Sequence, residues 1–178
     1  MRIIAGTLKG RRLEAPDWPG LRPTSDRLRE TLFNILAPRI EGARVLDGYA
    51  GTGAVGIEAL SRGAAHVTFV ESDRRAQALI ETNLRSCGIA DRYAIIRAGF
   101  AAAARSGGEF DLIFLDPPYG AGQLSAALQA GSLLVGPETL LIVEHATRDP
   151  APAAVGALER TREVIHGDSA LAFYRRRN

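Results

Sequence analysis

The sequence predicts one α/β domain built on a doubly wound parallel sheet, with a short N-terminal extension. From residue 43 onwards, short apolar runs alternate with helical patterns, as in repeated βα units. The run at 44–47 ends in a carboxylate, Asp47, and passes through a glycine loop into a helical pattern. A second run, at 110–115, ends in Asp116 and two prolines. Both motifs therefore lie where a doubly wound sheet opens its crevice.

The composition is that of a globular chain. Its 178 residues correspond to one domain, and an apolar share of 46% is enough for a full core. No apolar run approaches the ~20 residues that a membrane helix needs, and the start of the chain lacks a signal-peptide core. The single cysteine, Cys87, cannot form an internal disulfide, so we expect a cytoplasmic protein. The three histidines do not have the spacing of a metal site, so we expect no metal. The share of hydrophobic residues is not high enough to require a second subunit, so we expect a monomer.

The charge of the chain is unevenly distributed although its formal net value is only +2. Residues 1–30 hold seven basic and four acidic side chains, whereas residues 31–174 hold twelve basic and sixteen acidic ones. Three arginines, 175–177, follow. Basic ends on an acidic body suggest a polyanionic partner, although a bias of the genome towards arginine would give the same pattern.

The first 36 residues predict a hairpin, a loop and a helix. Apolar residues flank Gly6 and Gly10 in the stretch 1–14, which is typical of a hairpin. A loop rich in proline and glycine follows, and Pro23 with its polar successors begins a helix that reaches Leu36. We assign residues 1–23 to an N-terminal hairpin extension that would dock the polyanionic partner, and residues 24–178 to the main domain.

The remaining elements complete a seven-stranded sheet. The strand-like runs are 44–47, 66–71, 93–97, 110–115, 139–145, 163–166 and 170–174. The helical stretches between them are 55–62, 74–87, 100–105 and 123–130. Only three residues, 167–169, join the last two strands, which predicts a terminal antiparallel hairpin. The prolines at 150 and 152 mark a surface loop.

The glycine loop predicts a ligand site at the start of a helix. Gly51, Gly53 and Gly56 have the spacing of a dinucleotide-binding loop, which lets the backbone lie against a ligand. Asp47, four residues before the first glycine, would repel a pyrophosphate but would pair with an ammonium group. The ligand should therefore carry a cation, as the methionine part of S-adenosylmethionine does. Glu71, at the end of the next run, suits hydrogen bonds to a ribose diol, a feature that NAD and S-adenosylmethionine share.

The motif at 116–119 predicts a site for a planar base with an exocyclic amine. Pro117 and Pro118 stiffen the turn and remove two N–H donors, which leaves carbonyls and the Asp116 carboxylate as acceptors. Asp116 and the Pro117 carbonyl can each accept one N–H of the amine, so that the nitrogen lone pair points at an electrophile. Tyr119 can stack on the base. In a doubly wound sheet the first and fourth strands flank the switch point, so Asp47 and Asp116 should open onto one crevice.

With these motifs, the chain resembles the class I S-adenosylmethionine-dependent methyltransferases, which have a Rossmann-like fold, and within them the bacterial RsmD family. The resemblance rests on the blocks at 2–6, 22–34, 45–64, 70–73, 116–119 and 167–171, and the second and third of these narrow it to the family. The chain departs from the family pattern at Gly48, where a large apolar residue is usual, at Tyr49, where Phe is common, and at Gly99, where many relatives have an adenine-binding Asp.

The resemblance implies transfer of a methyl group from S-adenosylmethionine to N2 of one guanine, number 966, in 16S ribosomal RNA. It implies as substrate the small ribosomal subunit or an assembly intermediate. Catalysis is expected from Asp116, Pro117 and Tyr119. We expect cofactor binding by Asp47, Tyr49, Gly51, Gly53, Glu71, Ser72, Gly99, Phe100 and Asp116. We expect RNA phosphates to be bound by Arg2, Lys9, Arg11, Arg12, Arg22, Arg27 and Arg29.

Three alternatives remain open from the sequence. The motif at Asp116 would also serve methylation of adenine N6 or cytosine N4 in DNA, but the chain has no room for a DNA target-recognition domain. A non-catalytic RNA-binding module on the same fold is disfavoured by intact Asp47, Glu71 and Asp116. An NAD-dependent oxidoreductase is disfavoured by Asp47 and by the lack of an obvious catalytic pair.

Overall fold

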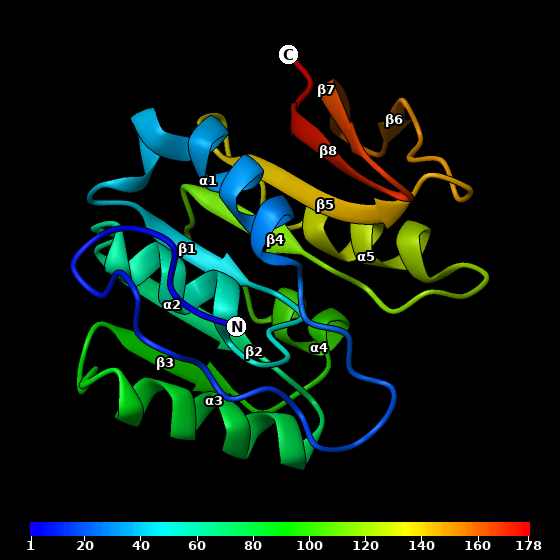
Figure 1. The fold of residues 1–178 in the computed structure, drawn as a ribbon. Coiled ribbons are helices and arrows are strands. Elements are labelled where there is room, and N and C mark those ends of the chain that lie inside the picture. The colour runs from blue at the N-terminus through cyan, green and yellow to red at the C-terminus, as the bar shows by residue number, and fades with distance from the viewer.

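A computed structural model describes all residues, 1–178, and contains one eight-stranded sheet (Figure 1). The strand order is β3-β2-β1-β4-β5-β8-β7-β6. The strands are β1 (Arg44–Asp47), β2 (His66–Val70), β3 (Tyr93–Ile96), β4 (Leu112–Leu115), β5 (Leu140–Ala146), β6 (Ala154–Val155), β7 (Leu158–His166) and β8 (Ser169–Arg176). The strands β1 to β5 pair in parallel, and β8, β7 and β6 extend the sheet in antiparallel pairs.

This order confirms the predicted α/β fold with a doubly wound sheet and a terminal antiparallel hairpin, β7–β8. The predicted number of seven strands is wrong by one, because residues 154 and 155, to which we assign no element, form the short strand β6 and pair with β7. Strand β7 also begins five residues earlier than predicted. Residues 159–162 are all polar, so this half of the strand lacks the alternation of apolar and polar side chains that marks a strand in a sequence.

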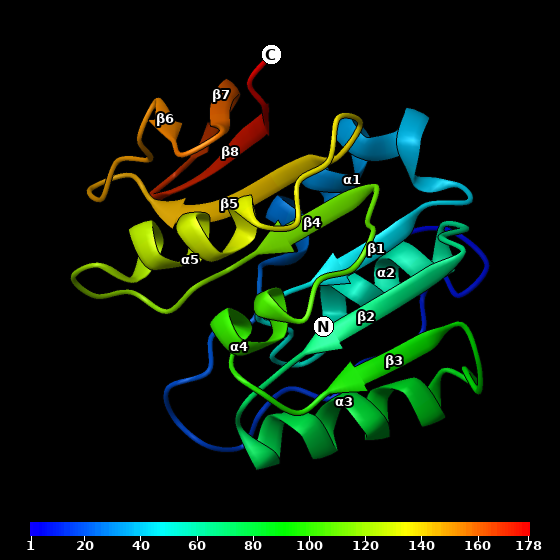
Figure 2. The same cartoon turned by 180° about the vertical axis from the view of Figure 1, so that it is seen from behind.

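Five helices cover the two faces of the sheet: α1 (Asp26–Ile40), α2 (Ala54–Ser61), α3 (Arg74–Ser86), α4 (Phe100–Arg105) and α5 (Gln123–Ser132). Figures 1 and 2 show α1 and α2 on one face and α4 and α5 on the other. The core is divided in the same way, because one apolar cluster joins α1, α2 and α3 to the sheet and a second joins α4 and α5 to it. None of the helices is both long and apolar enough to span a membrane.

Helix α1 begins as predicted and ends later. The Ser25 side chain accepts a hydrogen bond from the Leu28 N–H (3.1 Å), which caps the first turn. The helix continues through Pro38 to Ile40, four residues beyond the predicted end. A proline in the last turn removes little helical hydrogen bonding, so Pro38 does not end the helix, and the buried Leu36 and Ile40 pack its last turns into the core.

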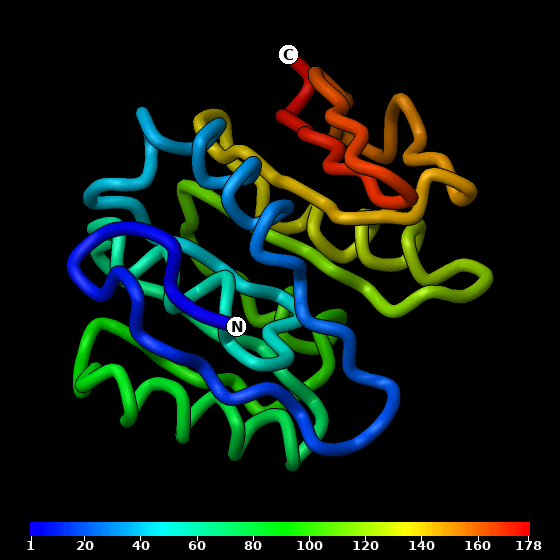
Figure 3. The backbone as a smooth tube through the Cα atoms, viewed as in Figure 1, coloured from blue at the N-terminus to red at the C-terminus, as the bar shows by residue number.

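The N-terminal segment, residues 1–25, lies along the helices instead of standing apart from them. Figure 3 shows its tube crossing α2 and α3 before it enters α1. A single β-bridge, Arg2 to Arg12, takes the place of the predicted hairpin strands. Ile3 and Leu13 are buried in the same core cluster as α1, α2 and α3. The division of the chain at residue 23 stays a prediction.

Candidate active site

The glycine loop joins β1 to α2, and each of its three glycines has a structural reason. Gly51 and Gly53 have φ values of +58° and +81°, in the left-handed region that side chains rarely adopt. Gly53 is also the N-cap of α2, so the free N–H groups of the helix begin at this loop. A Cβ at Gly56 would lie 2.3 Å from Cε1 of Phe69, so this glycine brings helix and sheet together.

Asp47 is a buried carboxylate at the end of β1, with 1% of its surface exposed. Its Oδ2 accepts a hydrogen bond from the Gly56 N–H at 3.1 Å. Burial raises the pKa of Asp47 to about 7, and the nearby charge of Glu71 adds to this effect. No cation of the protein forms an ion pair with this carboxylate. A ligand that carries a positive charge would therefore be stabilised here.

Glu71 follows β2 and lies next to the glycine loop. Its Oε1 accepts a hydrogen bond from the Gly51 N–H (2.8 Å), and its Oε2 accepts one from the Asp73 N–H (2.9 Å). These bonds hold the carboxylate beside the loop, at the position where we expected a ribose partner. Ser72, the next residue, is exposed.

Three of the predicted cofactor-binding residues, Tyr49, Gly99 and Phe100, lie at the ends of β1 and β3. The rings of Tyr49 and Phe100 pack with their centroids 5.3 Å apart, and Phe100 is buried. Gly99 is exposed, and a Cβ there would meet no other atom within 4 Å. The departure at Gly48 has a packing reason, because a Cβ at that position would lie 2.5 Å from Leu115 and 2.9 Å from the Phe100 ring.

Asp116 follows β4, the strand that pairs with β1 in the register Asp47 to Phe114. The carboxylates of Asp47 and Asp116 therefore lie near each other at the carboxyl ends of paired strands, where the strand order predicts the crevice, and the charge of Asp47 acts on Asp116. Burial raises the pKa of Asp116 well above its usual range, and the charges of Glu144 and Asp47 act in the same direction. Pro117 is buried, whereas Tyr119 is 49% exposed and has the Arg148 guanidinium 5.5 Å from its ring centroid.

Sequence reasoning missed two polar residues of this crevice, Glu144 and Thr24. Glu144 lies on β5, which pairs with β4 in the register Leu115 to Val143, so it is the strand neighbour of Asp116. The Thr24 hydroxyl, from the N-terminal segment, donates to Glu144 Oε2 at 3.2 Å. The signal for Glu144 is a carboxylate near the carboxyl end of an otherwise apolar central strand. The contact of Thr24 spans 120 residues and leaves no local signal.

The N-terminal segment also passes over the cofactor loop. A Cβ at Gly51 would lie 3.2 Å from Cδ1 of Leu21, and the Trp18 ring has the Arg75 guanidinium 4.9 Å from its centroid. Further back, the Glu14 N–H donates to Asn83 Oδ1 at 2.7 Å. The loop between residues 14 and 25 is therefore fixed to α3, to the glycine loop and to β5.

Six of the seven predicted phosphate-binding cations are exposed: Arg2, Lys9, Arg11, Arg12, Arg22 and Arg27. Three of them, Arg2, Lys9 and Arg27, line a hollow of about 330 Å³ between the N-terminal segment and α1, together with Asp26 and Glu30. A larger hollow of about 630 Å³, between α3 and β3, contains none of the predicted site residues. These six cations therefore lie on the N-terminal segment and on the first turn of α1.

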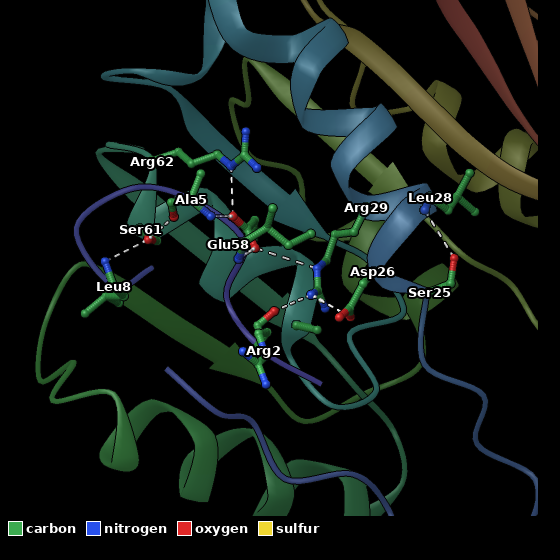
Figure 4. Close-up of polar contacts among 12 residues, drawn as sticks. Arg2, Ala5, Leu8, Ser25, Asp26, Leu28, Arg29, Glu58, Ser61 and Arg62 are labelled. Carbon is green, nitrogen blue, oxygen red and sulfur yellow. Dashed lines mark hydrogen bonds and ion pairs between the residues drawn. The ribbon is translucent and has the colours of Figure 1, made fainter. Parts of the chain in front are cut away.

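The assignment of Arg29 to RNA binding is wrong. Its side chain is fully buried, and it contacts the Arg2 carbonyl, Asp26 and Glu58 (Figure 4). A guanidinium in this position cannot reach a phosphate at the surface. In the sequence Arg29 is one of several cations near the start of α1, and nothing local marks it as buried. The facing helix α2 supplies the buried acid, Glu58, to which it is paired.

No group of three His, Cys, Asp or Glu side chains in the structure is placed to hold a metal ion. The acidic residues of the crevice instead form a row across the ends of β2, β1, β4 and β5: Glu71, Asp47, Asp116 and Glu144. A ligand that supplies positive charge and hydrogen-bond donors would be stabilised by this row.

Comparison with known proteins places the chain among relatives of similar length. The profile of a family described as "Conserved hypothetical protein 95" matches residues 1–175. The "Ribosomal RNA small subunit methyltransferase D" of Escherichia coli (strain K12) is 38% identical over 178 residues, which cover 99% of this chain and 90% of that protein. The "Putative rRNA methyltransferase YlbH" of Bacillus subtilis (strain 168) is also 38% identical, and the match covers 99% of this chain and 100% of that protein.

A solved structure with the same architecture is the putative methyltransferase yhhF from Escherichia coli. It superposes with a TM-score of 0.88 at 34% identity, and the match covers 100% of this chain and 98% of that one.

Proposed function

This chain belongs to the RsmD family, and we propose that it transfers a methyl group from S-adenosylmethionine to the exocyclic N2 of guanine 966 in 16S ribosomal RNA. The observation that carries the proposal is the pairing of two motifs across neighbouring strands. Asp47 and the glycine loop follow β1, and Asp116-Pro117-Pro118-Tyr119 follows β4. The relatives named as methyltransferases of small-subunit ribosomal RNA support the choice of substrate.

The residues around the glycine loop fit S-adenosylmethionine. The buried Asp47 carboxylate lacks a cationic partner and would hold the ammonium group of the methionine moiety. Gly51 and Gly53 allow the left-handed turn that would bring the backbone of the loop against this moiety, and Glu71 lies beside them to accept hydrogen bonds from the ribose. Tyr49, Ser72, Gly99 and Phe100 surround the adenine side. When bound, S-adenosylmethionine supplies an electrophilic methyl group on its sulfonium sulfur.

The motif after β4 would hold the base. A guanine within folded RNA must leave its stack to enter the crevice, at a cost of a few kcal/mol. Asp116 and the Pro117 carbonyl then each accept one N–H of the exocyclic amine, and Tyr119, half-exposed at the rim, stacks on the ring. The lone pair of the nitrogen is thereby directed at the methyl donor. Positioning of this kind accounts for roughly 7–11 kcal/mol of a barrier, and Asp116 or water takes the proton that the alkylated amine releases.

Transfer of labelled methyl groups tests the proposal. Small ribosomal subunits from a strain that lacks this gene are incubated with the protein and labelled S-adenosylmethionine. Label on a single guanine of 16S RNA is the expected result. If neither subunits nor bare RNA accept label while the protein binds the cofactor, the proposed substrate is wrong, and labelling of adenine or cytosine in DNA becomes the next test.

Cofactor affinity should depend on pH through Asp47. Because its pKa in the empty site is about 7, the carboxylate must lose a proton at lower pH before it can pair with an ammonium group. Affinity for S-adenosylhomocysteine, which keeps that ammonium, should therefore fall about fivefold from pH 7 to pH 6. Isothermal titration calorimetry measures this fall, together with the uptake or release of protons. The Asp47→Asn variant should bind S-adenosylhomocysteine weakly at both pH values, and its affinity should not fall between them. An equal fall in the variant would show that another group causes the pH dependence.

RNA binding should depend on the exposed cations of the N-terminal segment. The double charge reversal Arg11→Glu/Arg12→Glu should weaken binding of small subunits by at least about tenfold and reduce its salt dependence, because phosphate contacts are lost. Cofactor affinity should stay unchanged. The matched control Arg105→Glu/Arg162→Glu alters the exposed end of α4 and strand β7 by the same charge. Equal losses in both variants would show a general charge effect and contradict a docking face at residues 2–12.

A further inference from the structure

One residue of the crevice has no role in the reaction proposed above: Glu144, on β5. It is 8% exposed and sits beside Asp116 across the β4–β5 pair. The only hydrogen bond that the protein gives to its carboxylate comes from the Thr24 hydroxyl, at 3.2 Å to Oε2. The second oxygen, Oε1, accepts no hydrogen bond from the protein, and it is not one of the side-chain atoms that are fully shielded from solvent, so a ligand can reach it.

The surroundings of Glu144 destabilise the charged form of its carboxylate. Burial raises the pKa of Glu144, and the Thr24 hydroxyl and the charge of the adjacent His145 only partly oppose this. The other carboxylates of the crevice, Asp116, Asp47 and Glu71, supply no positive charge. Neither an arginine nor a lysine forms an ion pair with Glu144. A neutral residue would be more stable here, so the free oxygen indicates a donor supplied by a ligand.

The proposed substrate carries such a donor. On the edge of guanine that holds the exocyclic N2 amine, the ring nitrogen N1 bears a hydrogen. On the corresponding edges of adenine and cytosine, the ring nitrogen beside the amine is bare and is an acceptor. Asp116 and Pro117 would bind the amine of any of these bases. A second acceptor beside Asp116 is what distinguishes guanine from them.

We propose that Glu144, held by Thr24, accepts a hydrogen bond from the N1–H of the target guanine and thereby selects guanine over bases with a bare ring nitrogen. This inference rests on the proposed function and adds a specificity-determining residue to it. A bare ring nitrogen would face the carboxylate with its lone pair and leave two acceptors in contact. The charge-assisted bond to N1–H would also relieve the crowding of negative charge that Asp116 and Glu144 share.

The test compares two small subunits that differ in one base. Both are reconstituted with RNA ligated at the target position, one with guanine and one with 2-aminopurine, which keeps the N2 amine but lacks N1–H and O6. The wild-type protein should prefer guanine by at least about 100-fold in kcat/KM. In Glu144→Gln, the amide keeps the bond from Thr24 and can donate to a bare N1, so the preference should fall to less than about tenfold. Binding of the two subunits in the presence of S-adenosylhomocysteine should shift in parallel.

Two controls separate the possible outcomes. Glu159→Gln, an exposed glutamate on β7, should leave the preference unchanged. If Glu144→Gln lowers kcat/KM for both subunits by the same factor, the residue has only a structural role and the inference fails. If the wild-type protein labels neither guanine nor 2-aminopurine at this position, the proposed function itself fails, which the wild-type measurement alone reveals.

Discussion

Replacement of Asp116 by alanine should lower methyl transfer to small subunits by about 10³-fold or more. Asp116 is the side-chain acceptor that fixes the amine of the base, and the Pro117 carbonyl alone would leave the nitrogen free to rotate out of line. Loss of one pre-organised partner at a reacting centre typically costs about 10²–10³ in rate, and misplacement of the nucleophile adds to this. Affinity for S-adenosylhomocysteine should change by less than about tenfold, because Asp47 and Glu71 remain.

Two further variants make this result specific. Asp116→Asn keeps one oxygen that accepts an N–H and should retain more activity than the alanine variant. Asp149→Ala, which removes an exposed carboxylate, should be as active as the wild type. The alanine variant should melt no lower than the wild type, since Asp116 is repelled by Glu144 and Asp47 in the folded state. An Asp116→Ala protein with more than a tenth of wild-type activity would refute the role of this carboxylate in orienting the base.

The central sheet could be predicted because its information is local. Each of the strands β1 to β5 is a short apolar run bounded by glycines, prolines or charged residues, and each helix between them begins after a glycine or an aspartate at its N-cap. Asp73, for example, caps α3 with hydrogen bonds from Arg75 and Ala76. Strand β6 could not be predicted, because two residues are too few to show the alternation of apolar and polar side chains. Its pairing with β7 depends on the fold of the terminal hairpin.

The candidate site divides in the same way. Asp47, Gly51, Glu71 and Asp116 lie at the ends of predictable strands, so the strand order alone brings them together. Glu144 and Thr24 meet only through tertiary structure, across 120 residues. The error at Arg29 has the same origin, because a buried ion pair depends on a partner from another helix and not on the pattern of α1.

That ion pair gives a second large effect, on stability. Glu58 is fully buried on α2: its Oε1 accepts from the Ile4 N–H (2.9 Å), and its Oε2 accepts from the Ala5 N–H (3.1 Å) and from Arg62 Nε (2.8 Å). The Nε of Arg29 lies 3.7 Å from Oε1 (Figure 4). One carboxylate therefore joins the N-terminal segment to α1 and α2.

Replacement of Glu58 by glutamine should lower the free energy of unfolding by about 3–5 kcal/mol, because Arg29 would become a buried cation without its nearest buried acid. The amide also offers one acceptor oxygen where the carboxylate offers two. Urea unfolding measures the loss. Glu30→Gln removes an exposed glutamate from α1 and should change stability by less than about 0.5 kcal/mol. A loss below about 1 kcal/mol in Glu58→Gln would show that the pair contributes little.

The double variant Arg29→Met/Glu58→Gln distinguishes an orphaned charge from lost packing. Nε and Nη1 of Arg29 have no hydrogen-bond partner even in the wild type, so methionine removes a costly cation while keeping most of the side-chain volume. The double variant should therefore be more stable than Glu58→Gln alone. If it is less stable, Arg29 stabilises the fold through its contacts with Asp26 and the Arg2 carbonyl, independently of Glu58. In either case the N-terminal segment is held by α1 and α2, and its exposed cations take their positions from this buried contact.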